Sequence, residues 1–150
     1  MRLVIQRVAE ARVEVLQKTI GEIQRGLLVF IGIEQGDEPS DADWLIGKLI
    51  GLRVFSDDEG KMNRNVQEVS GDFLVISQFT LYASTKKGNR PSFVRSAPPA
   101  VAVPLYTYFI EQLRIRSGRS VQTGTFGADM QVHLQNDGPV TIIIDSNLKE

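Results

Sequence analysis

"DFLVISQFTLYA", residues 72–83, is the longest strand that the sequence predicts. Its centre is an unbroken apolar run, which is typical of a strand buried on both faces rather than on one. A strand of this kind lies inside a domain. The elements that precede and follow it in the chain therefore decide the fold class.

The residues before this stretch predict four short strands and one helix. Glycines separate the strand candidates, which are rich in Val, Ile and Leu and lie at residues 2–8, 12–16, 20–24 and 27–34. A helix is expected from Ser40, which is a good N-cap followed by acidic residues. Apolar residues then recur at helical spacing, at Trp44, Leu45, Leu49 and Leu52.

The residues after the stretch predict a second helix and further strands. A polar, basic loop, "STKKGNRPSF", comes first. The helix is expected to begin after Pro98-Pro99 or at Pro104 and to end near Arg116, with Gly118 as its stop. Strands return at about residues 120–125, 128–135 and 140–145. This order predicts a single α+β domain over residues 1–150, with a curved antiparallel or mixed sheet, or a barrel, and two main helices.

Length and composition exclude several classes of protein. A chain of 150 residues can bury a real hydrophobic core as one domain. The absence of cysteine excludes disulfides, thiolate nucleophiles and sulfur-ligated metals. No apolar run approaches the ~20 residues that span a bilayer, and the N-terminal "MRLVIQRV" lacks the apolar core of a signal peptide. We therefore expect a cytoplasmic protein with no membrane partner.

The charge is unevenly distributed along the chain, although the net charge is only −1. The segment from Tyr82 to Arg119 has a net charge of +6, and the remainder has −7. Within residues 82–119 the one acidic residue is Glu111, and the basic residues are Lys86, Lys87, Arg90, Arg95, Arg114, Arg116 and Arg119. Such a segment favours an anionic partner such as a phosphate backbone. The alternative is a solvated loop followed by cations at a helix C-terminus.

The ionisable groups needed for the commonest hydrolytic sites are missing. His133 is the only histidine, and alternation in "MQVHLQ" places it on the polar face of a strand. A Ser-His-Asp triad or a zinc site is therefore poorly supported. "DDE" at residues 57–59 could bind a hard cation but is more typical of a solvated loop. No phosphate-binding glycine motif occurs, and nothing in the sequence demands a metal or an organic cofactor.

Two stretches remain as candidates for a site built from hydroxyl, amide and backbone groups. The first is "SQFTL", Ser77 to Leu81, where strand alternation predicts that Gln78 and Thr80 lie opposite Ser77 and Phe79. The alternative is a strand that passes from core to surface. The second is Gly138-Pro139 in "QNDGPVTIIID", which could equally be a turn before a strand.

Taken together, these stretches resemble the signatures of the D-aminoacyl-tRNA deacylase family, of the standard bacterial and eukaryotic type. The resemblance covers nearly the whole chain, through "MRLVIQRV", "GLLVFIGI", "RVFSDDEGKMN", "SQFTL", "RPSF" and "TGTFGADMQVHLQNDGPVT" in the family order. It implies the fold of that family and a homodimer in which "SQFTL" of one subunit faces Gly138-Pro139 of the other. It also implies a cis bond between Gly138 and Pro139, and Arg7 matches the family arginine that holds this motif.

The implied reaction is hydrolysis of the ester that joins a D-amino acid to the terminal adenosine of tRNA. The resemblance assigns catalysis to Ser77, Gln78, Phe79 and Thr80. A backbone N–H of Phe79 or Thr80 could stabilise the oxyanion without an ionisable side chain. Water or the ribose 2′-hydroxyl could move the proton. A covalent role for the Thr80 hydroxyl ranks lower because the sequence shows no base to activate it.

Substrate selection is expected to depend on the Gly138 and Pro139 carbonyls, which could accept hydrogen bonds from the substrate ammonium. An L side chain would meet this wall and a D side chain would point to solvent, so glycyl-tRNA should also be accepted. Phe126 and Met130 could hold the adenine or could be ordinary core residues. The partner is the acceptor end of aminoacyl-tRNA, with no DNA partner. Rival readings are a non-catalytic RNA-binding module and, more weakly, a small-ester hydrolase.

Overall fold

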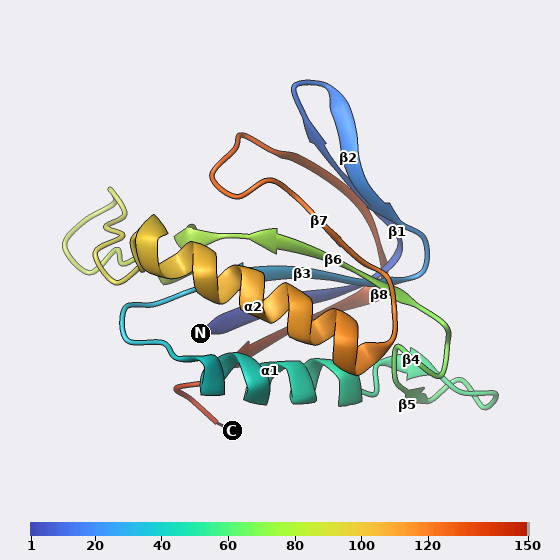
Figure 1. Cartoon of the computed structure of the whole chain (residues 1–150). Helices are drawn as coiled ribbons and strands as arrows, with labels where there is room; N and C mark the ends of the chain where they lie inside the picture. The colour runs from blue at the N-terminus through green and yellow to red at the C-terminus, as the bar shows by residue number, and fades with distance from the viewer. Residues whose placement is uncertain (150) are drawn as a thin grey trace.

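One mixed sheet carries most of the strands in the computed structural model, which describes residues 1–149 (Figure 1). Its main path runs in the order β2-β1-β3-β6-β7, and β8 pairs with β1 as well. The β3–β6 and β6–β7 pairs are parallel, and β1 is antiparallel to each of its partners. The strands of this sheet are β1 (Arg2–Val15), β2 (Lys18–Ile23), β3 (Gly26–Gly32), β6 (Asp72–Ser77), β7 (Val121–Thr123) and β8 (Gln131–Asp145).

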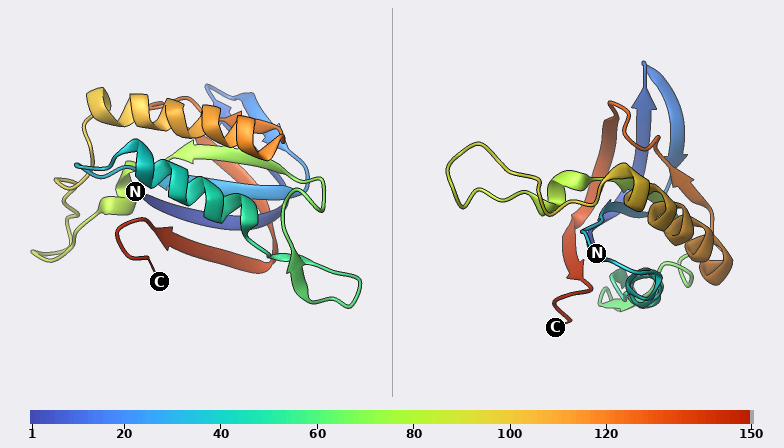
Figure 2. Two further views of the ribbon diagram at one scale, coloured as in Figure 1. Left: turned by 60° about the horizontal axis from the view of Figure 1, so that its bottom comes forward. Right: turned by 60° about the vertical axis from the view of Figure 1, so that its left-hand side comes forward.

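Two helices, α1 (Pro39–Gly51) and α2 (Pro99–Ser117), lie side by side on one face of this sheet (Figure 2). A hairpin of β4 (Phe55–Ser56) and β5 (Met62–Arg64) follows α1. These observations confirm the predicted α+β domain with two main helices. None of the helices in residues 1–149 is long and apolar enough to cross a membrane.

The central strand β6 is buried on both faces, as its apolar run predicts. Phe73 and Val75 belong to the core beneath the two helices, whereas Leu74 and Ile76 belong to a second core on the opposite face of the sheet. All four side chains are almost fully inaccessible. Alternate side chains of one strand therefore contribute to both hydrophobic cores. The residues that follow β6 consequently lie at the edge of both cores.

The strand is shorter than predicted, because it ends at Ser77. Residues Phe79–Tyr82 form the 3₁₀ turn η1 instead of continuing the strand. The amide of Leu81 donates to the Gln78 carbonyl, and Tyr82 turns into the interior. The predicted alternation of side chains through "SQFTL" is therefore wrong, because these residues do not form a strand ladder.

Two other pairs of predicted strands are continuous in the structure. Residues 2–8 and 12–16 were predicted separately but belong to the single strand β1, which pairs with β3 in its first half and β2 in its second. The strands predicted at residues 128–135 and 140–145 likewise belong to one strand, β8, which begins at Gln131 and runs through Gly138 and Pro139. Register shifts in the β1–β8 pairing absorb these residues as a bulge opposite Arg7, where proline costs no ladder hydrogen bond.

The helix ends differ slightly from the predictions. The N-cap of α1 is Glu38, and Ser40 lies in the first turn. The Asp41 carboxylate accepts a hydrogen bond from the Glu38 amide and so caps the helix in place of the predicted serine. Helix α2 begins at Pro99 and includes Pro104 near its start. It ends as predicted before Gly118, which has φ of +62°.

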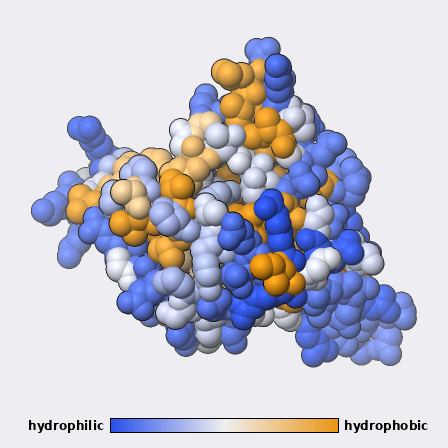
Figure 3. Space-filling model, in the orientation of Figure 1, coloured by the Kyte–Doolittle hydropathy of each residue, from blue (hydrophilic) through white to orange (hydrophobic). Residues whose placement is uncertain are grey.

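The surface seen in Figure 3 is mostly hydrophilic. Apolar side chains gather at the tip of the β1–β2 hairpin, where Leu16 is exposed. A hydrophilic projection marks the loop between η1 and α2, which stands away from the body of the molecule in the right-hand view of Figure 2. This loop contains the predicted basic stretch.

Candidate active site

A pocket of about 250 Å³ opens where β6 gives way to η1. Strands β3 and β6, the turn, helix α2, the segment before β8 and the start of β8 all contribute to its walls. The lining residues are Ile31, Ile33, Ile76, Ser77, Gln78, Phe79, Ala97, Ala102, Tyr106, Phe126, Gly127, Ala128, Met130 and Val132. The pocket is therefore largely apolar, with a polar rim formed by the first residues of "SQFTL".

Five predicted site residues meet at this pocket: Ser77, Gln78, Phe79, Phe126 and Met130. Phe126 packs on the buried ring of Tyr106, with 5.8 Å between ring centroids. The Tyr106 hydroxyl donates to the Val75 carbonyl at 3.0 Å, and burial raises the pKa of Tyr106 to about 12. Tyr106 is thus a neutral structural wall, and it holds Phe126 where a flat apolar group could lie against it.

The turn presents two backbone donors that have no acceptor within residues 1–149: the N–H groups of Phe79 and Thr80. They are the first amides of η1, where the turn itself provides no partner. The preceding amide, that of Gln78, is already bonded to the Ile31 carbonyl. One of the two free donors belongs to Phe79, which lines the pocket, and the other belongs to the next residue in the turn.

The same turn is held in place through its carbonyl groups. The Ser96 hydroxyl donates to the Phe79 carbonyl at 2.9 Å, and the Arg2 guanidinium donates to the Leu81 carbonyl at 2.8 Å. Arg2 is fixed in turn by an ion pair with Asp145 at the end of β8. Arg2 and Ser96 were not predicted as site residues, because nothing in the local sequence marks residues that act across 79 and 17 positions of chain.

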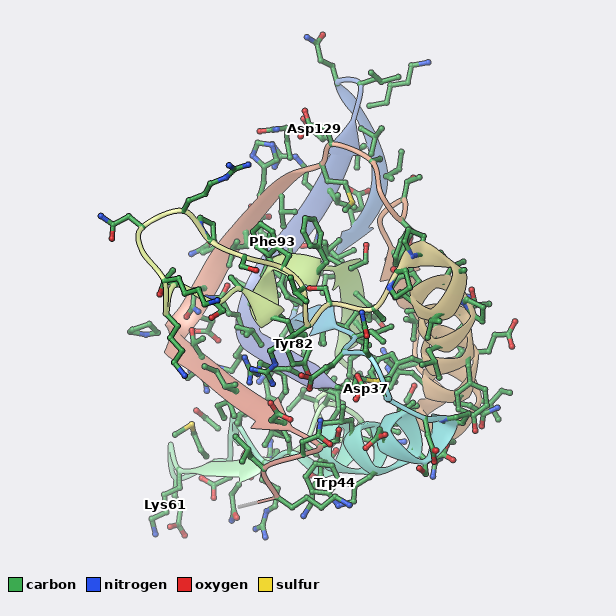
Figure 4. The ribbon with its side chains drawn as sticks, turned by 90° about the vertical axis from the view of Figure 1, so that its left-hand side faces the viewer. Asp37, Trp44, Lys61, Tyr82, Phe93 and Asp129 are labelled. Carbon is green, nitrogen blue, oxygen red and sulfur yellow. The ribbon has the colours of Figure 1, made fainter. Side chains whose placement is uncertain are left out.

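Tyr82 is the last residue of this turn, and Figure 4 shows it inside the fold below Phe93. Its ring lies between two guanidinium groups, with Arg2 at 4.9 Å and Arg95 at 5.3 Å from the centroid. Its buried hydroxyl makes no hydrogen bond within residues 1–149. Burial, reinforced by the nearby Asp37, raises the pKa of Tyr82 far above its ordinary value, so the ring remains neutral.

Thr80 is placed differently from the other predicted catalytic residues, because it does not line the pocket. Its side chain is exposed, and its hydroxyl accepts a hydrogen bond from the Gln78 side-chain amide. An amide N–H is a donor and cannot remove a proton from the hydroxyl. The surroundings of Thr80 therefore provide no base that would make it a nucleophile.

The Gly138–Pro139 segment forms a second, separate feature on β8. The peptide bond between the two residues is cis, as the resemblance implied. Arg7 donates to the Asp137 carbonyl at 2.8 Å and to the Val54 carbonyl at 2.5 Å, which confirms that Arg7 contacts this motif. Gly138 and Pro139 themselves are exposed at the surface.

Asn136 holds the other side of this segment and was also missed from the sequence. Its side-chain oxygen accepts from the Val140 amide at 2.9 Å, and its side-chain nitrogen donates to the Val140 carbonyl at 3.1 Å. Gly138 has φ of +152°, and a Cβ there would lie 2.7 Å from the Val140 nitrogen. Glycine is therefore required at this position both by conformation and by space.

Within one protomer, the pocket and the Gly138–Pro139 segment are far apart on the sheet. Ser77 is level with Ile31 and hence with Leu3 on β1, whereas the bulge lies opposite Arg7. Four residues along a strand correspond to about 13 Å. On β8 itself, Gly138 lies six residues beyond Val132, which lines the pocket. The structure of one chain does not bring these two predicted parts of the site together.

The model of the family described as D-Tyr-tRNA(Tyr) deacylase matches residues 4–145. The chain belongs to this family. Two relatives named D-aminoacyl-tRNA deacylase, from Flavobacterium johnsoniae and Phocaeicola vulgatus, are 53% and 55% identical to it over 150 residues, which is all of each chain.

Two solved structures share the fold of this chain. The "c-Myc DNA Unwinding Element Binding Protein" has a TM-score of 0.90 and 41% identity, and the match covers 97% of this chain and 98% of that one. A "probable eukaryotic D-amino acid tRNA deacylase" has a TM-score of 0.80 at 20% identity, with 95% and 97% covered, and shows the shared fold alone.

The remaining ionisable candidates of this deacylase-family chain lie away from the pocket. His133 lies on the exposed strand β8, as predicted, with its Nε2 at 3.5 Å from a Glu14 carboxylate oxygen. Residues 57–59 lie in the turn between β4 and β5. No cluster of three or more His, Cys, Asp or Glu side chains arranged for a metal occurs in the described part of the chain.

The basic segment does not form one continuous surface for an anion. Four of its arginines have partners within the chain: Arg95 pairs with Glu34, Arg114 donates to the Val121 carbonyl, Arg116 pairs with Asp43, and Arg119 pairs with Asp72. The prediction of a single +6 anion-binding segment is therefore too broad. Only Lys86, Lys87 and Arg90 make no ion pair or hydrogen bond within residues 1–149.

Proposed function

We propose that the protein hydrolyses the ester bond between a D-amino acid and the terminal adenosine of tRNA, releasing both. The observation that carries this proposal is the pocket beside η1, with free N–H groups at its edge and no ionisable side chain but Tyr106 among its lining residues. The names of the relatives support the substrate class.

The proposed chemistry is electrostatic stabilisation rather than covalent catalysis. An aminoacyl ester is already activated, so the protein must position it and stabilise the oxyanion that forms when water attacks the carbonyl carbon. The N–H groups of Phe79 and Thr80 are free to donate to that oxygen. Water or the 2′-hydroxyl of the substrate carries the proton, which agrees with the lack of a histidine at the pocket.

The adenine is assigned to the apolar end of the pocket. Phe126 and Met130 lie there, and Tyr106 holds the Phe126 ring from behind. A stacked base would direct the ribose and its ester toward the polar rim at Ser77 and Gln78. This arrangement places the reacting carbonyl next to the free N–H groups of the turn.

Chiral selection is assigned to the Gly138–Pro139 segment of a partner subunit. The two motifs lie far apart in one chain, and the segment is exposed and firmly held by Arg7 and Asn136. In a homodimer, its carbonyls would accept hydrogen bonds from the substrate ammonium and would meet an L side chain. Because glycine has no side chain to reject, glycyl-tRNA is also accepted.

Time courses with D-tyrosyl-tRNA and L-tyrosyl-tRNA test this function. The protein is expected to accelerate loss of the D ester well beyond the buffer rate and to leave the L ester at that rate. Equal loss of both esters, or no acceleration of either, would contradict the proposal. Binding of tRNA without acceleration would favour the alternative, a non-catalytic RNA-binding module on this scaffold.

A further inference from the structure

The loop between η1 and α2 carries three cations that the rest of the fold does not use. Lys86, Lys87 and Arg90 are exposed and make no ion pair or hydrogen bond within residues 1–149. No acidic residue occurs between Tyr82 and Ile110 to neutralise them. The other four basic side chains of this part of the chain have internal partners, so the positive charge available to a ligand is concentrated here.

The loop has a defined base. Ser84 and Ser92 exchange two backbone hydrogen bonds, of 2.8 and 2.9 Å, which close the loop into a narrow projection. The cations lie between these two residues, around Gly88, which has φ of +129° and supplies the turn at the tip. The three charges are therefore presented together on one projection rather than scattered over a surface (Figure 2).

The base of the loop is attached to the wall of the pocket. The rings of Phe93 and Phe79 meet edge to face, with 5.0 Å between their centroids. Ser96 donates to the Phe79 carbonyl, and the next residue, Ala97, lines the pocket itself. A ligand bound along the loop would thus continue directly into the pocket.

The length of the loop matches a nucleic-acid strand that leaves the pocket. Four residues separate its base from its tip, which corresponds to a reach of about 13 Å. At about 3.4 Å per stacked nucleotide, this reach spans several nucleotides. A strand with its terminal adenosine in the pocket would place the preceding phosphates beside the three cations.

We propose that residues 84–92 form a phosphate-binding loop, in which Lys86, Lys87 and Arg90 hold the backbone of the nucleotides that precede the terminal adenosine. The identification of the bound nucleic acid as the end of tRNA rests on the proposed function. It adds a second contact area, separate from the pocket, that distinguishes a tRNA ester from a small ester. Three contacts to a single strand give a slope of log K against log salt concentration of about −2.

The test compares the wild type with the loop variant Lys86→Gln/Lys87→Gln/Arg90→Gln and a control, Lys18→Gln/Lys48→Gln/Lys61→Gln. The control removes the same charge at exposed positions on β2, α1 and the β4–β5 turn. For each protein, kcat/KM is measured for D-tyrosyl-tRNA and for D-tyrosyl-adenosine, and the Kd for uncharged tRNA is measured over a range of salt concentrations.

The ratio of the two kcat/KM values is expected to fall about tenfold or more in the loop variant and to remain at the wild-type value in the control. The salt slope for tRNA binding should fall toward zero in the loop variant alone. An unchanged ratio and slope in the loop variant, or equal changes in both variants, would overturn the loop proposal. A wild type that binds tRNA with this slope but hydrolyses neither ester would overturn the proposed function and leave the loop supported.

Discussion

At the scale of single residues, Phe79 contributes to the site through its backbone groups as well as its side chain. Its ring is exposed and contacts Phe93, its carbonyl accepts from Ser96, and its N–H is free at the edge of the pocket. Each part of the residue therefore has a separate role. Substitutions that alter one part and keep the others can separate those roles.

A proline at position 79 removes the N–H, and position 79 is the first residue of η1, where proline is well tolerated. Phe79→Pro is expected to lower kcat for D-tyrosyl-tRNA by about 10²–10³, the usual cost of losing one oxyanion donor. Phe79→Ala keeps the N–H and serves as the control for loss of the ring. Equal effects of the two substitutions on kcat, measured in single turnovers, would show that the N–H of Phe79 does not act on the reacting oxygen.

The side chain of Thr80 tests the covalent alternative. Thr80→Ala removes a hydroxyl whose one partner within residues 1–149 is the Gln78 amide. The loss of that hydrogen bond, worth about 1 kcal/mol, should lower kcat by less than about tenfold. Removal of a covalent nucleophile instead costs on the order of 10⁶. A loss of that size with tRNA binding intact would show that the hydroxyl attacks the ester.

At the scale of elements, the bulge in β8 combines an exposed surface with a rigid base. Arg7 reaches it from β1 and Asn136 closes it from within, so the backbone of residues 137–140 is held by at least three hydrogen bonds. A regular strand would pair these groups with β1 and would not present them outward. The bulge therefore suits a part that must meet a substrate in one orientation.

Gly138→Ala is expected to distort this bulge, because the added Cβ would lie 2.7 Å from the Val140 nitrogen and 2.8 Å from a Val140 side-chain carbon. The predicted result is a reduced ratio of D-tyrosyl-tRNA to L-tyrosyl-tRNA hydrolysis. Gly60→Ala is a suitable control, since Gly60 has φ of +78°, no atom lies within 4 Å of the added group, and the residue does not line the pocket. If the ratio of D to L ester hydrolysis were unchanged in both the Gly138 variant and the control, the Gly138–Pro139 segment would have no role in chiral selection.

At the scale of the whole molecule, one chain contains both halves of the proposed site but holds them apart on the sheet. The pocket is at the end of β6 and is also lined by Val132 at the start of β8, whereas the bulge at Gly138 lies six residues further along β8. A homodimer solves this separation if each subunit places its bulge at the pocket of the other. Two-fold symmetry then produces two identical sites from one contact.

A heterodimer with Phe79→Pro in one subunit and Gly138→Ala in the other tests this arrangement. It can be isolated with a different affinity tag on each subunit. A site shared between subunits leaves one pocket with both parts intact, so about half of the wild-type rate should remain, with wild-type discrimination between D and L esters. If each subunit used its own bulge, the one active pocket would have the altered wall, and discrimination would be reduced.

The sequence by itself determined the elements whose signals are local. The apolar run of residues 73–76, the helical spacing of Leu45 and Leu49, and the stop at Gly118 each depend on a few neighbouring residues, and the structure agrees with them. The signatures "SQFTL" and "NDGPVT" were also readable, because a motif is a local string. These local patterns were enough for the fold class, the family and five of the residues that line the pocket.

Only the tertiary structure decided which distant groups meet. It ended β6 at Ser77, joined the predicted strands on either side of Pro139, and paired Arg95, Arg116 and Arg119 with acids 61, 73 and 47 residues away. The physical reason is that a bulge, a turn or an ion pair is stabilised by contacts with other strands, and no local propensity records those contacts.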